Sequence, residues 1–424
     1  MSFLIWRWFC SVALPLAMWT SALQTVTRAQ EAPDRKAAAN FTLVDGDRVV
    51  LLGSTFIERD QTHGYLETAL TSRFHTRKIE FRNLGWSGDN VLGEARARFG
   101  TVADGFEHLK QHVLALNPTV IFLSYGATES FAGQAGLESF LAGLEVLLKT
   151  LDETHARIVF ISPPRHEDLG RPLPDPTEHN RQLKIYSDAI SDVAAKRQAP
   201  FVNLYELLGE KLRPPAGAPL TDNGLHLTAY GYWRATPVIE RALGLPSRRW
   251  QIEIDAKNKN VSANGTAVSQ LQVSPTGIAF HALDQQLPLA PAPPGSPQTT
   301  GSLGLRVFRV TGLPAGKYTL KIDGQEVGTA DSQQWAGNAG LGAGPDFEQV
   351  ELLRKTIIAK NRLYFHRWRP QNETYLFGFR KHEQGQNAIE IPQFDPLIAA
   401  QEATIHQLSA PVARAYQLIK VDAK

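Results

Sequence analysis

The stretch LTDNGLHLTAYGY, residues 220–232, places a histidine beside acid and amide side chains in a turn that opens into a helical pattern. Its chemical candidates are His226, Asp222 and Asn223. A histidine exchanges protons near neutral pH, and a side chain three or four residues earlier in a turn can hold its other ring nitrogen. Because any surface turn can also carry these residue types, the stretch gains meaning only if the rest of the chain supplies a nucleophile and an oxyanion hole.

This stretch closes a run of short apolar segments that alternate with amphipathic ones. The chain of 424 residues is too long for one ordinary core, since single cores stop growing at roughly 250 to 300 residues, so two or more domains are expected. The alternation predicts an α/β fold over residues 47–246, with a doubly wound, flavodoxin-like parallel sheet between two layers of helices. The predicted strands are residues 49–53, 79–83, 119–124, 158–162 and 201–204, and the predicted helices are residues 64–74, 105–116, 136–153, 175–196 and 228–243.

In such sheets ligands bind at the carboxyl ends of the strands, so the residues that follow each strand are the candidates for a site. After the first three strands come Gly53-Ser54-Thr55, Gly85-Trp86-Ser87-Gly88-Asp89 and Tyr125-Gly126-Ala127-Thr128-Glu129. Ser162-Pro163-Pro164-Arg165 follows the fourth strand, and the opening stretch follows the fifth. One rim is therefore expected to gather hydroxyl groups, glycine-rich turns and a histidine.

The order and spacing of these blocks resemble the GDSL or SGNH hydrolase family of esterases and lipases over residues 48–244. Members of that family use a Gly-Asp-Ser nucleophile turn, a glycine, a Gly-x-Asn-Asp turn and an Asp-x-x-His pair. The resemblance implies an esterase-like site with a nucleophile, a base, a triad acid and an oxyanion hole. The residues that it assigns are Thr55 as nucleophile, Ser54 at the motif's aspartate, Gly88 and Thr128 in the oxyanion hole, His226 as base, and Asn223 at the triad aspartate with Asp222 beside it.

Several of these positions depart from the family pattern in ways that weaken the expected chemistry. Threonine has the required hydroxyl, but its methyl group restricts χ1 and crowds the attacking face, so Thr55 is a poorer nucleophile than serine. Ser54 is the other hydroxyl in this turn, and only one of the two is expected to face His226. Thr128 is shorter than asparagine, and loss of one oxyanion donor costs about 3 to 4 kcal/mol. Asn223 can orient the histidine without supplying a negative charge, unless the neighbouring Asp222 takes that role.

Two functions stay open on this basis. The first is a hydrolase of acyl esters, including acetyl esters on carbohydrate, that takes a small-molecule or carbohydrate substrate and transfers its acyl group to water by Ser/Thr-His chemistry. The second is a catalytically inactive binding or structural protein that keeps the hydrolase fold. Neither function requires a cofactor or a metal, and the sequence has no metal-ligand cluster or P-loop. The sequence does not define the oligomeric state.

The first 29 residues have the pattern of a signal peptide. Arg7 precedes an apolar run from Trp8 to Leu23, and residues 27–29 offer small side chains at the two positions that a signal peptidase reads. Export to the periplasm or the medium is expected, with no membrane-spanning segment after cleavage. The alternative is a retained membrane anchor, but the run falls short of the ~20 apolar residues that a span needs. Residues 30–46 are expected to form a linker.

Cleavage would remove two arginines and no acidic residue, which reduces the formal net charge of +2 to zero. A neutral chain argues against a nucleic acid as partner, because binding to a polyanion needs a strongly basic surface. The only cysteine, Cys10, lies inside the predicted signal peptide, so the processed chain would contain neither disulfides nor thiol ligands.

After Pro246 the helical period gives way to short alternating segments, which predict a small β-sandwich over residues 247–330. Residues 331–424 are expected to form a helical region that packs on the other domains, with helices at 346–369 and 395–409. The second of these helices is expected to begin with Asp395 as N-cap. A basic and aromatic run over residues 354–382 has two interpretations, a sugar- or polyanion-binding face or lid, and an inter-domain contact, of which we favour the contact.

Five further residues near the rim are candidates for shaping a pocket. Tyr65, Trp86 and Phe131 could form its walls, and Arg165 and Arg171 lie in a proline-rich loop where they could contact an anion. Packing or solvated surface is the more ordinary role of such residues.

Overall fold

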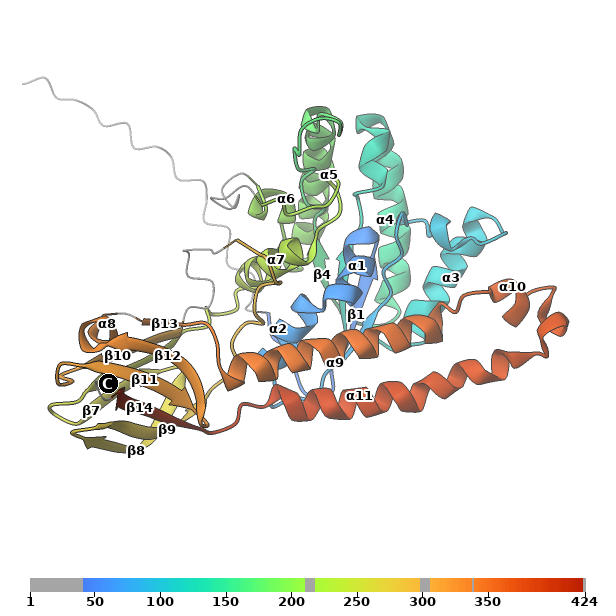
Figure 1. The fold of residues 1–424 in the computed structure, drawn as a ribbon. Coiled ribbons are helices and arrows are strands. Elements are labelled where there is room, and N and C mark those ends of the chain that lie inside the picture. Colours follow the sequence, from blue (N-terminus) through green and yellow to red (C-terminus); the bar gives the residue numbers. More distant parts are fainter. Residues whose placement is uncertain (1–40, 210–217, 298–305, 338, 422–424) are drawn as a thin grey trace, which may run out of the picture. The chain divides into compact units, whose positions relative to one another are not determined.

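The computed structural model describes residues 41–209, 218–297, 306–337 and 339–421 (Figure 1). The predicted signal peptide and residues 30–40 of the predicted linker lie outside the described residues. Phe41 and Leu43, at the end of that linker, are buried in the first hydrophobic core. Within the described ranges, no helix combines the length and apolar character that a membrane crossing needs.

The N-terminal part is built on a five-stranded sheet in the order β2-β1-β3-β4-β5, and each of its pairings is parallel. This is the flavodoxin-like order, so the predicted fold class is confirmed. The strands are β1 (Arg48–Gly53), β2 (Glu80–Asn83), β3 (Val120–Ser124), β4 (Arg157–Ile161) and β5 (Phe201–Val202).

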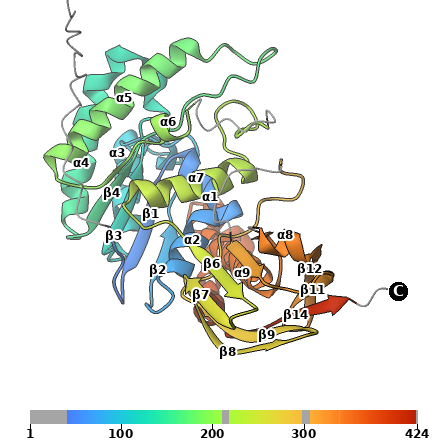
Figure 2. The same cartoon turned by 90° about the vertical axis from the view of Figure 1, so that its left-hand side faces the viewer.

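Helices cover both faces of this sheet because successive side chains of each buried strand point to opposite faces. In β1, Val49 and Leu51 belong to one hydrophobic core, and Val50 and Leu52 belong to another. Figure 2 shows α3, α4 and α5 on one side of the sheet and α1, α2 and α7 on the other. The helices are α1 (Thr55–His63), α2 (Tyr65–Arg73), α3 (Val102–Leu114), α4 (Leu137–Asp152), α5 (Thr177–Lys196), α6 (Leu204–Leu207) and α7 (Ala229–Ala242), with short 3₁₀ turns η1 (Glu94–Arg96), η2 (Glu129–Ala132) and η3 (Gln134–Gly136).

Helix α1 is a feature that the sequence pattern did not predict. It begins directly after β1, and Gly64 separates it from α2 with φ of +65°, in the left-handed region that favours glycine. Helix α1 buries only Ile57 and Asp60, so its apolar period is weak. The consequence for the site is that Thr55 stands at the first position of a helix rather than in an open loop.

The described residues of the range 250–341, together with residues 414–421, form a β-sandwich of two sheets, ordered β13-β10-β6-β7 and β12-β11-β14-β9-β8. Strand β14 lies in the middle of the second sheet, where Tyr416 and Leu418 enter the shared core and Tyr416 stacks on Phe280. The sandwich predicted over 247–330 thus receives a central strand from the end of the region predicted to be helical. The strands are β6 (Trp250–Asp255), β7 (Asn260–Asn264), β8 (Thr266–Ser274), β9 (Gly277–Asp284), β10 (Arg306–Thr311), β11 (Lys317–Ile322), β12 (Gln325–Asp331), β13 (Ala339–Leu341) and β14 (Arg414–Val421), with helix α8 (Ser332–Ala336) after β12.

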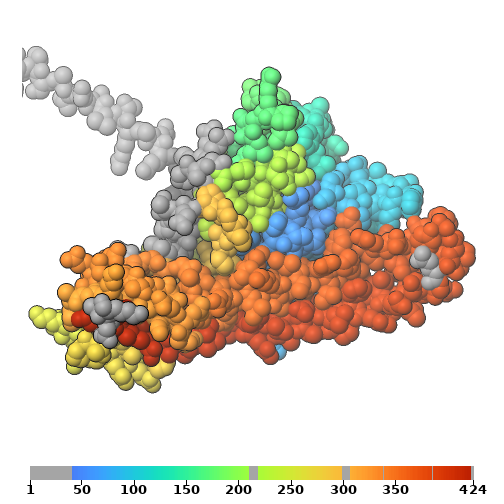
Figure 3. Space-filling model, viewed as in Figure 1, coloured from blue at the N-terminus to red at the C-terminus, as the bar shows by residue number. Residues whose placement is uncertain are grey.

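Two long helices, α9 (Pro345–Trp368) and α11 (Phe394–Ser409), connect β13 to β14. Helix α11 begins one residue before Asp395, which therefore lies in the first turn and is not the predicted N-cap. Between the two lie α10 (Glu373–Leu376) and the 3₁₀ turns η5 (Lys381–Gln384) and η6 (Asn387–Gln393). Helix α9 contacts α1, α2 and β2, and Figure 3 shows the orange C-terminal helices directly against the blue segment of α1 and α2.

The predicted inter-domain contact of residues 354–382 agrees with this packing. Arg354 donates to the backbone oxygen of His63 at 2.7 Å and lies over the ring of Tyr65 at 4.6 Å. Tyr364 and Trp368 belong to the second core of the parallel-sheet domain. In this part of the run, aromatic and basic side chains bind the two halves of the protein together.

Asp60 on α1 is a buried carboxyl group whose ionisation opposes folding. Burial, and after it the negative charge of Glu67, raise its pKa from the ordinary value of 3.8 to about 7. Because the folded state keeps a proton that the unfolded chain has already lost between about pH 4 and pH 7, the free energy of unfolding decreases as the pH rises through that window. We expect Asp60→Asn to weaken this dependence, so that thermal unfolding shows a higher Tm than wild type above about pH 7. An equally steep fall in the Tm of both proteins would contradict this role.

Candidate functional site

The two hydroxyl groups after β1 point in different directions. Ser54 is buried, and its Oγ lies 3.2 Å from Oγ1 of Thr128. Thr55, the first residue of α1, is half-buried, and its Oγ1 accepts a hydrogen bond from the backbone N–H of Gly88 at 3.2 Å. Thr55 is therefore the hydroxyl that meets the glycine of the predicted oxyanion hole. The Thr128 hydroxyl, predicted as a second oxyanion donor, is engaged with Ser54 instead.

The loop that carries Gly88 is fixed by its contacts with α1 and by hydrogen bonds of Asp89. Gly88 has φ of +75°, which favours glycine, and Gly85 lies so close to α1 that an added Cβ would stand 2.1 Å from the backbone N of Glu58. The Asp89 carboxylate accepts from Nε of Arg96 at 2.6 Å and from the Tyr125 hydroxyl at 3.1 Å, inside the protein. These contacts fix the direction in which the Gly88 N–H points.

Glu129 joins the loop after β2 to the loop after β3. Its carboxylate accepts from the N–H of Val91 at 3.0 Å and from the N–H of Gly126 at 2.9 Å. Burial raises the pKa of Glu129. The carboxyl group thus links the loop that carries Gly88 to the loop that carries Thr128, and its role is structural.

Asn223 fixes the tautomer of the His226 ring. The Asn223 Oδ1 accepts from the backbone N–H groups of Leu225 at 3.1 Å and of His226 at 2.9 Å, so the amide cannot be turned round without the loss of both bonds. Its Nδ2 therefore faces Nδ1 of His226, at 3.2 Å. An amide NH₂ is a donor only, which makes Nδ1 the acceptor and leaves the proton of the neutral ring on Nε2. A general base needs the opposite tautomer, with a lone pair on the nitrogen that faces the nucleophile.

The carboxylate of Asp222 is engaged elsewhere. Its Oδ2 accepts from Nη2 of Arg59 at 2.6 Å, and its Oδ1 lies 4.0 Å from Nδ1 of His226, beyond hydrogen-bond distance. Burial lowers the pKa of His226, the positive charge of Arg59 lowers it further, and Asp222 acts in the opposite direction. The ring is thus neutral at pH 7. In the described part of the chain it has no hydrogen bond to Thr55, and such bonds often tighten only when substrate binds.

Arg59 is a site residue that sequence reasoning missed. It lies four residues after Thr55, so on a helix the two share a face. Prediction of α1 would have supplied that signal. By pairing with Asp222, Arg59 reduces the influence of the carboxylate on the histidine.

A second missed arrangement supports the loop after β3. The Ser130 Oγ lies 2.9 Å from Nε2 of His179, whose Nδ1 lies 3.1 Å from Nδ1 of His166. Burial lowers the pKa of His179 to about 4. Since Ser130 is fully buried, this chain of polar groups anchors loops rather than presenting a nucleophile. A proline-rich segment separates the two histidines along the chain, so no sequence periodicity indicated that they are in contact.

The other rim candidates have packing or surface roles. Tyr65 is buried, and Phe131 is exposed and stacks on the ring of His179 at 4.0 Å. Arg171 is exposed. Trp86 lies against the guanidinium of Arg369, and Arg165 lies over the ring of Tyr205. In the described ranges, no group of three or more His, Cys, Asp or Glu side chains is arranged to hold a metal ion.

Residues 52–234 match the GDSL-like Lipase/Acylhydrolase family. Over these residues the chain is similar to that family. The match covers the parallel sheet and its rim, and it supports hydrolysis of ester substrates as the general class of activity. No curated protein sequence matches the chain.

Among solved structures, a gut microbial diltiazem-metabolizing enzyme is similar over 91% of this chain and 100% of its own, with a TM-score of 0.71 and 18% sequence identity. At that identity the likeness establishes the fold, including the sandwich and the C-terminal helices. An acetylxylan esterase from Geobacillus stearothermophilus is similar over 48% of this chain and 96% of its own, with a TM-score of 0.38 and 17% identity.

The C-terminal region reaches the Gly88 loop of the GDSL-like domain through Arg369. The guanidinium lies over the ring of Trp86 at 3.5 Å from its centroid, and Nη1 donates to Oε2 of Glu58 at 3.1 Å. The same Glu58 oxygen accepts from the backbone N–H of Ser87. Arg369 thus supports two residues that precede Gly88, which makes it a candidate positioning residue for the predicted oxyanion hole.

We expect Arg369→Ala to lower kcat for ester hydrolysis by roughly tenfold with a smaller change in KM, because a displaced Gly88 N–H loses part of its stabilisation of the transition state. Arg369→Lys, which keeps the charge beside Glu58, should recover part of the rate. Arg367→Ala is the matched control, because Arg367 pairs with Asp395 on the surface. If Arg369→Ala lowers Tm and leaves kcat unchanged, the role is structural only.

Proposed function

We propose that this protein hydrolyses acyl esters of small or carbohydrate-sized molecules, with Thr55 as nucleophile. The observation that carries the proposal is the Gly88 N–H directed at the Thr55 hydroxyl, at 3.2 Å, on the rim of a GDSL-like domain. A backbone N–H beside a nucleophilic oxygen is well placed to stabilise the oxyanion that forms at the attacked carbonyl.

The chemistry follows the acyl-transfer scheme. The Thr55 oxygen attacks the ester carbonyl carbon while His226 takes the hydroxyl proton, and the proton then passes to the departing alcohol. The Gly88 N–H and the N–H of Thr55 itself, one of the orphan donors at the start of α1, stabilise the oxyanion. Water then attacks the acyl-Thr55 ester with His226 as base, which releases the acid and restores the hydroxyl.

Asn223 makes this catalyst slow. The amide stabilises the tautomer with the proton on Nε2, so the base form of His226 is a minor species. A methyl group on the nucleophile adds a steric cost. We therefore expect turnover well below that of a site with a serine and an aspartate at these positions.

Purified protein should release nitrophenol from 4-nitrophenyl acetate and acetate from acetylated xylo-oligosaccharides. Thr55→Ala and His226→Ala should each remove this activity, and Ser54→Ala, which alters a buried neighbour, should reduce it less. Absence of turnover in the wild type rejects the proposal. Loss of activity in Ser54→Ala with retention in Thr55→Ala assigns the nucleophile to Ser54.

A second candidate function is binding without catalysis. The observation that favours it is the amide of Asn223 at the triad position, where it holds His226 in the tautomer that cannot act as base. In that case the wild type is inactive, and the combined substitutions Thr55→Ser, Thr128→Asn and Asn223→Asp create activity. Turnover by the wild type rejects this candidate.

We also propose that the protein is exported. The proposal rests on the signal-like pattern of residues 1–29. N-terminal sequencing of the protein from a periplasmic or culture fraction should give a chain that begins near residue 30. An uncleaved N-terminus in the membrane fraction would support a retained anchor.

A further inference from the structure

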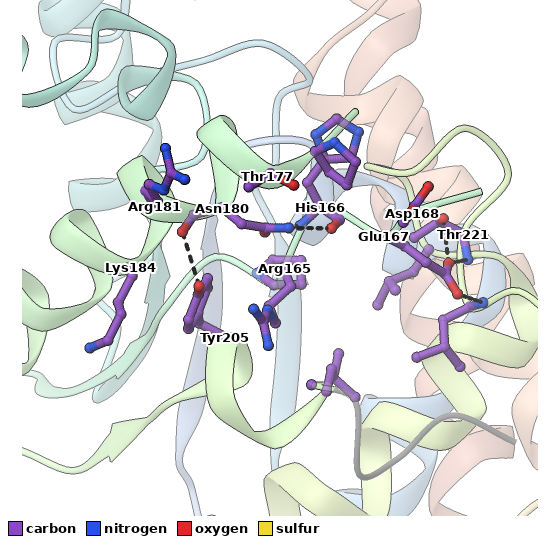
Figure 4. Close-up of a pocket in the computed structure, with 16 residues that line it drawn as sticks. Arg165, His166, Glu167, Asp168, Thr177, Asn180, Arg181, Lys184, Tyr205 and Thr221 are labelled. Atoms are coloured by element: carbon purple, nitrogen blue, oxygen red, sulfur yellow. Dashed lines mark hydrogen bonds between the residues drawn. The ribbon is translucent and has the colours of Figure 1, made fainter. Parts of the chain in front are cut away.

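A cavity of about 400 Å³ lies at the carboxyl ends of β4 and β5, between the loop after β4, α5 and the segment that leads to His226. Its size is that of a small-molecule site. In Figure 4, Arg165 lies beside Tyr205, Arg181 and Lys184 lie on the side of α5, and the acidic pair Glu167 and Asp168 lies on the opposite side. The cavity is therefore polarised by charge.

The acidic side chains of the cavity are already engaged. The Glu167 carboxylate accepts from the N–H groups of Leu220 at 3.1 Å and Thr221 at 2.8 Å, and from the Thr221 hydroxyl at 2.6 Å. Asp168 is exposed and accepts from the N–H of Gly170 at 2.9 Å. Among the described residues, neither carboxylate pairs with a cation across the cavity.

Two of the three cations are also paired, each with an acid on its own helix. Arg181 contacts Glu178, and Lys184 contacts Asp188 at 2.8 Å, all with exposed side chains. Arg165 differs from both. Its guanidinium lies 4.8 Å from the centre of the Tyr205 ring, and within the described ranges it has no carboxylate partner.

The support beneath Arg165 is fixed in advance. The Tyr205 hydroxyl donates to the backbone oxygen of Asn180 at 3.0 Å. The Asn180 side chain accepts from the N–H of His166 at 2.9 Å and donates to its carbonyl oxygen at 2.7 Å. An arginine held on an aromatic face presents its remaining N–H groups as a planar fork, which matches a carboxylate in two parallel hydrogen bonds.

The cavity shares a wall with the turn of residues 222–226, which carries His226. The N–H of Glu167 donates to the backbone oxygen of Gly224 at 2.8 Å, and His166 packs against Gly224, where an added Cβ would lie 2.7 Å from Nε2. Gly224 stands between Asn223 and His226. A ligand in the cavity is thus next to the segment that holds the proposed base.

We propose that this cavity binds a carboxylate, seated on Arg165, as part of the substrate. One guanidinium with no carboxylate partner among the described residues suits a singly charged planar anion better than a phosphate dianion. The apolar side chains of Leu208 and Leu227 suit the carbon skeleton that carries the anion. The substrate class is then an acyl ester of an acidic sugar or a similar carboxylate-bearing molecule. The proposal rests on the proposed ester hydrolysis only in making the ligand a substrate.

Titration calorimetry separates binding from catalysis. D-glucuronate should bind the purified protein, and D-glucose should not. Arg165→Gln should weaken glucuronate binding by roughly 10- to 100-fold, as expected for loss of charge-assisted hydrogen bonds. Arg165→Lys, which keeps the charge without the fork, should fall between the two. Unchanged thermal unfolding confirms that these variants fold.

Arg181→Gln is the matched control, since it removes an arginine of the same cavity that is exposed and already paired. Equal loss of binding in Arg181→Gln and Arg165→Gln, or tighter binding of inorganic phosphate than of glucuronate, overturns the assignment to Arg165 and a carboxylate. Hydrolysis of nitrophenyl acetate without glucuronate binding rejects the subsite and keeps the proposed function. Glucuronate binding without hydrolysis keeps the subsite and rejects the proposed function.

Discussion

Replacement of Asn223 with aspartate is expected to raise kcat for ester hydrolysis by roughly 100- to 10,000-fold, the range in which loss of a triad carboxylate lowers the rate of serine hydrolases. Aspartate has the shape of asparagine, so its Oδ1 can keep the bonds from Leu225 and His226 that hold the side chain. Its second oxygen then accepts from Nδ1–H of His226. The proton moves to Nδ1, and Nε2 becomes free to take the proton of the Thr55 hydroxyl.

The gain should appear in kcat and not in KM, because the tautomer matters in the proton-transfer step. The acid limb of the pH-rate profile should also shift to higher pH. Burial lowers the pKa of His226 in the wild type, and an adjacent carboxylate stabilises the imidazolium and raises it. A rate increase without this shift would point to a cause other than the histidine.

Asp222→Asn is the matched control, since it makes the same chemical change one residue earlier. Asp222 pairs with Arg59 and stands 4.0 Å from the ring, so its loss should change kcat much less than the Asn223 substitution does. If Asp222→Asn removes activity and Asn223→Asp has no effect, Asp222 is the triad acid and the tautomer argument is wrong.

The sequence was sufficient for the parallel-sheet domain because its strands are continuous apolar runs between glycine-rich turns. Every strand in the sheet was predicted within a few residues, and with parallel strands this placed Ser54, Gly88, Thr128 and His226 on one rim. Helix α1 was missed because it buries few apolar residues. Because α1 was not predicted, the helical face that brings Arg59 to Asp222 was not predicted either.

Contacts between distant segments could not be predicted, since they leave no local pattern. Strand β14 alternates like any half-buried strand, but only the folded sandwich reveals its place between β11 and β9. The pairing of Arg369 with Glu58 and the engagement of Thr128 with Ser54 depend on side chains that meet across more than 70 residues. The identity of each residue was visible in the sequence, and its partner was not.

Lys360→Met is expected to destabilise the protein by about 3 to 5 kcal/mol, the cost of breaking a buried ion pair by removal of one partner. Lys360 on α9 is 1% exposed, and its Nζ donates to Oε1 of Glu67 at 2.6 Å and to the backbone oxygen of Phe81 at 3.0 Å. Glu67 on α2 is 3% exposed, and among the described residues it keeps only the Asn361 amide as partner. Urea unfolding followed by circular dichroism measures the change.

The double variant Lys360→Met with Glu67→Gln is the decisive companion, because it removes both charges and leaves no buried ion. It should recover most of the lost stability, since a neutral buried pair is often as stable as the ion pair it replaces. Removal of the Glu67 charge should also lower the pKa of Asp60, whose second cause of elevation is that carboxylate. If α9 is an integral part of the GDSL-like domain, each variant unfolds in one transition with the same denaturant slope as wild type. A separate early transition in Lys360→Met would mean that α9 detaches on its own, and a loss below about 1 kcal/mol would mean that the pair is not desolvated as its burial implies.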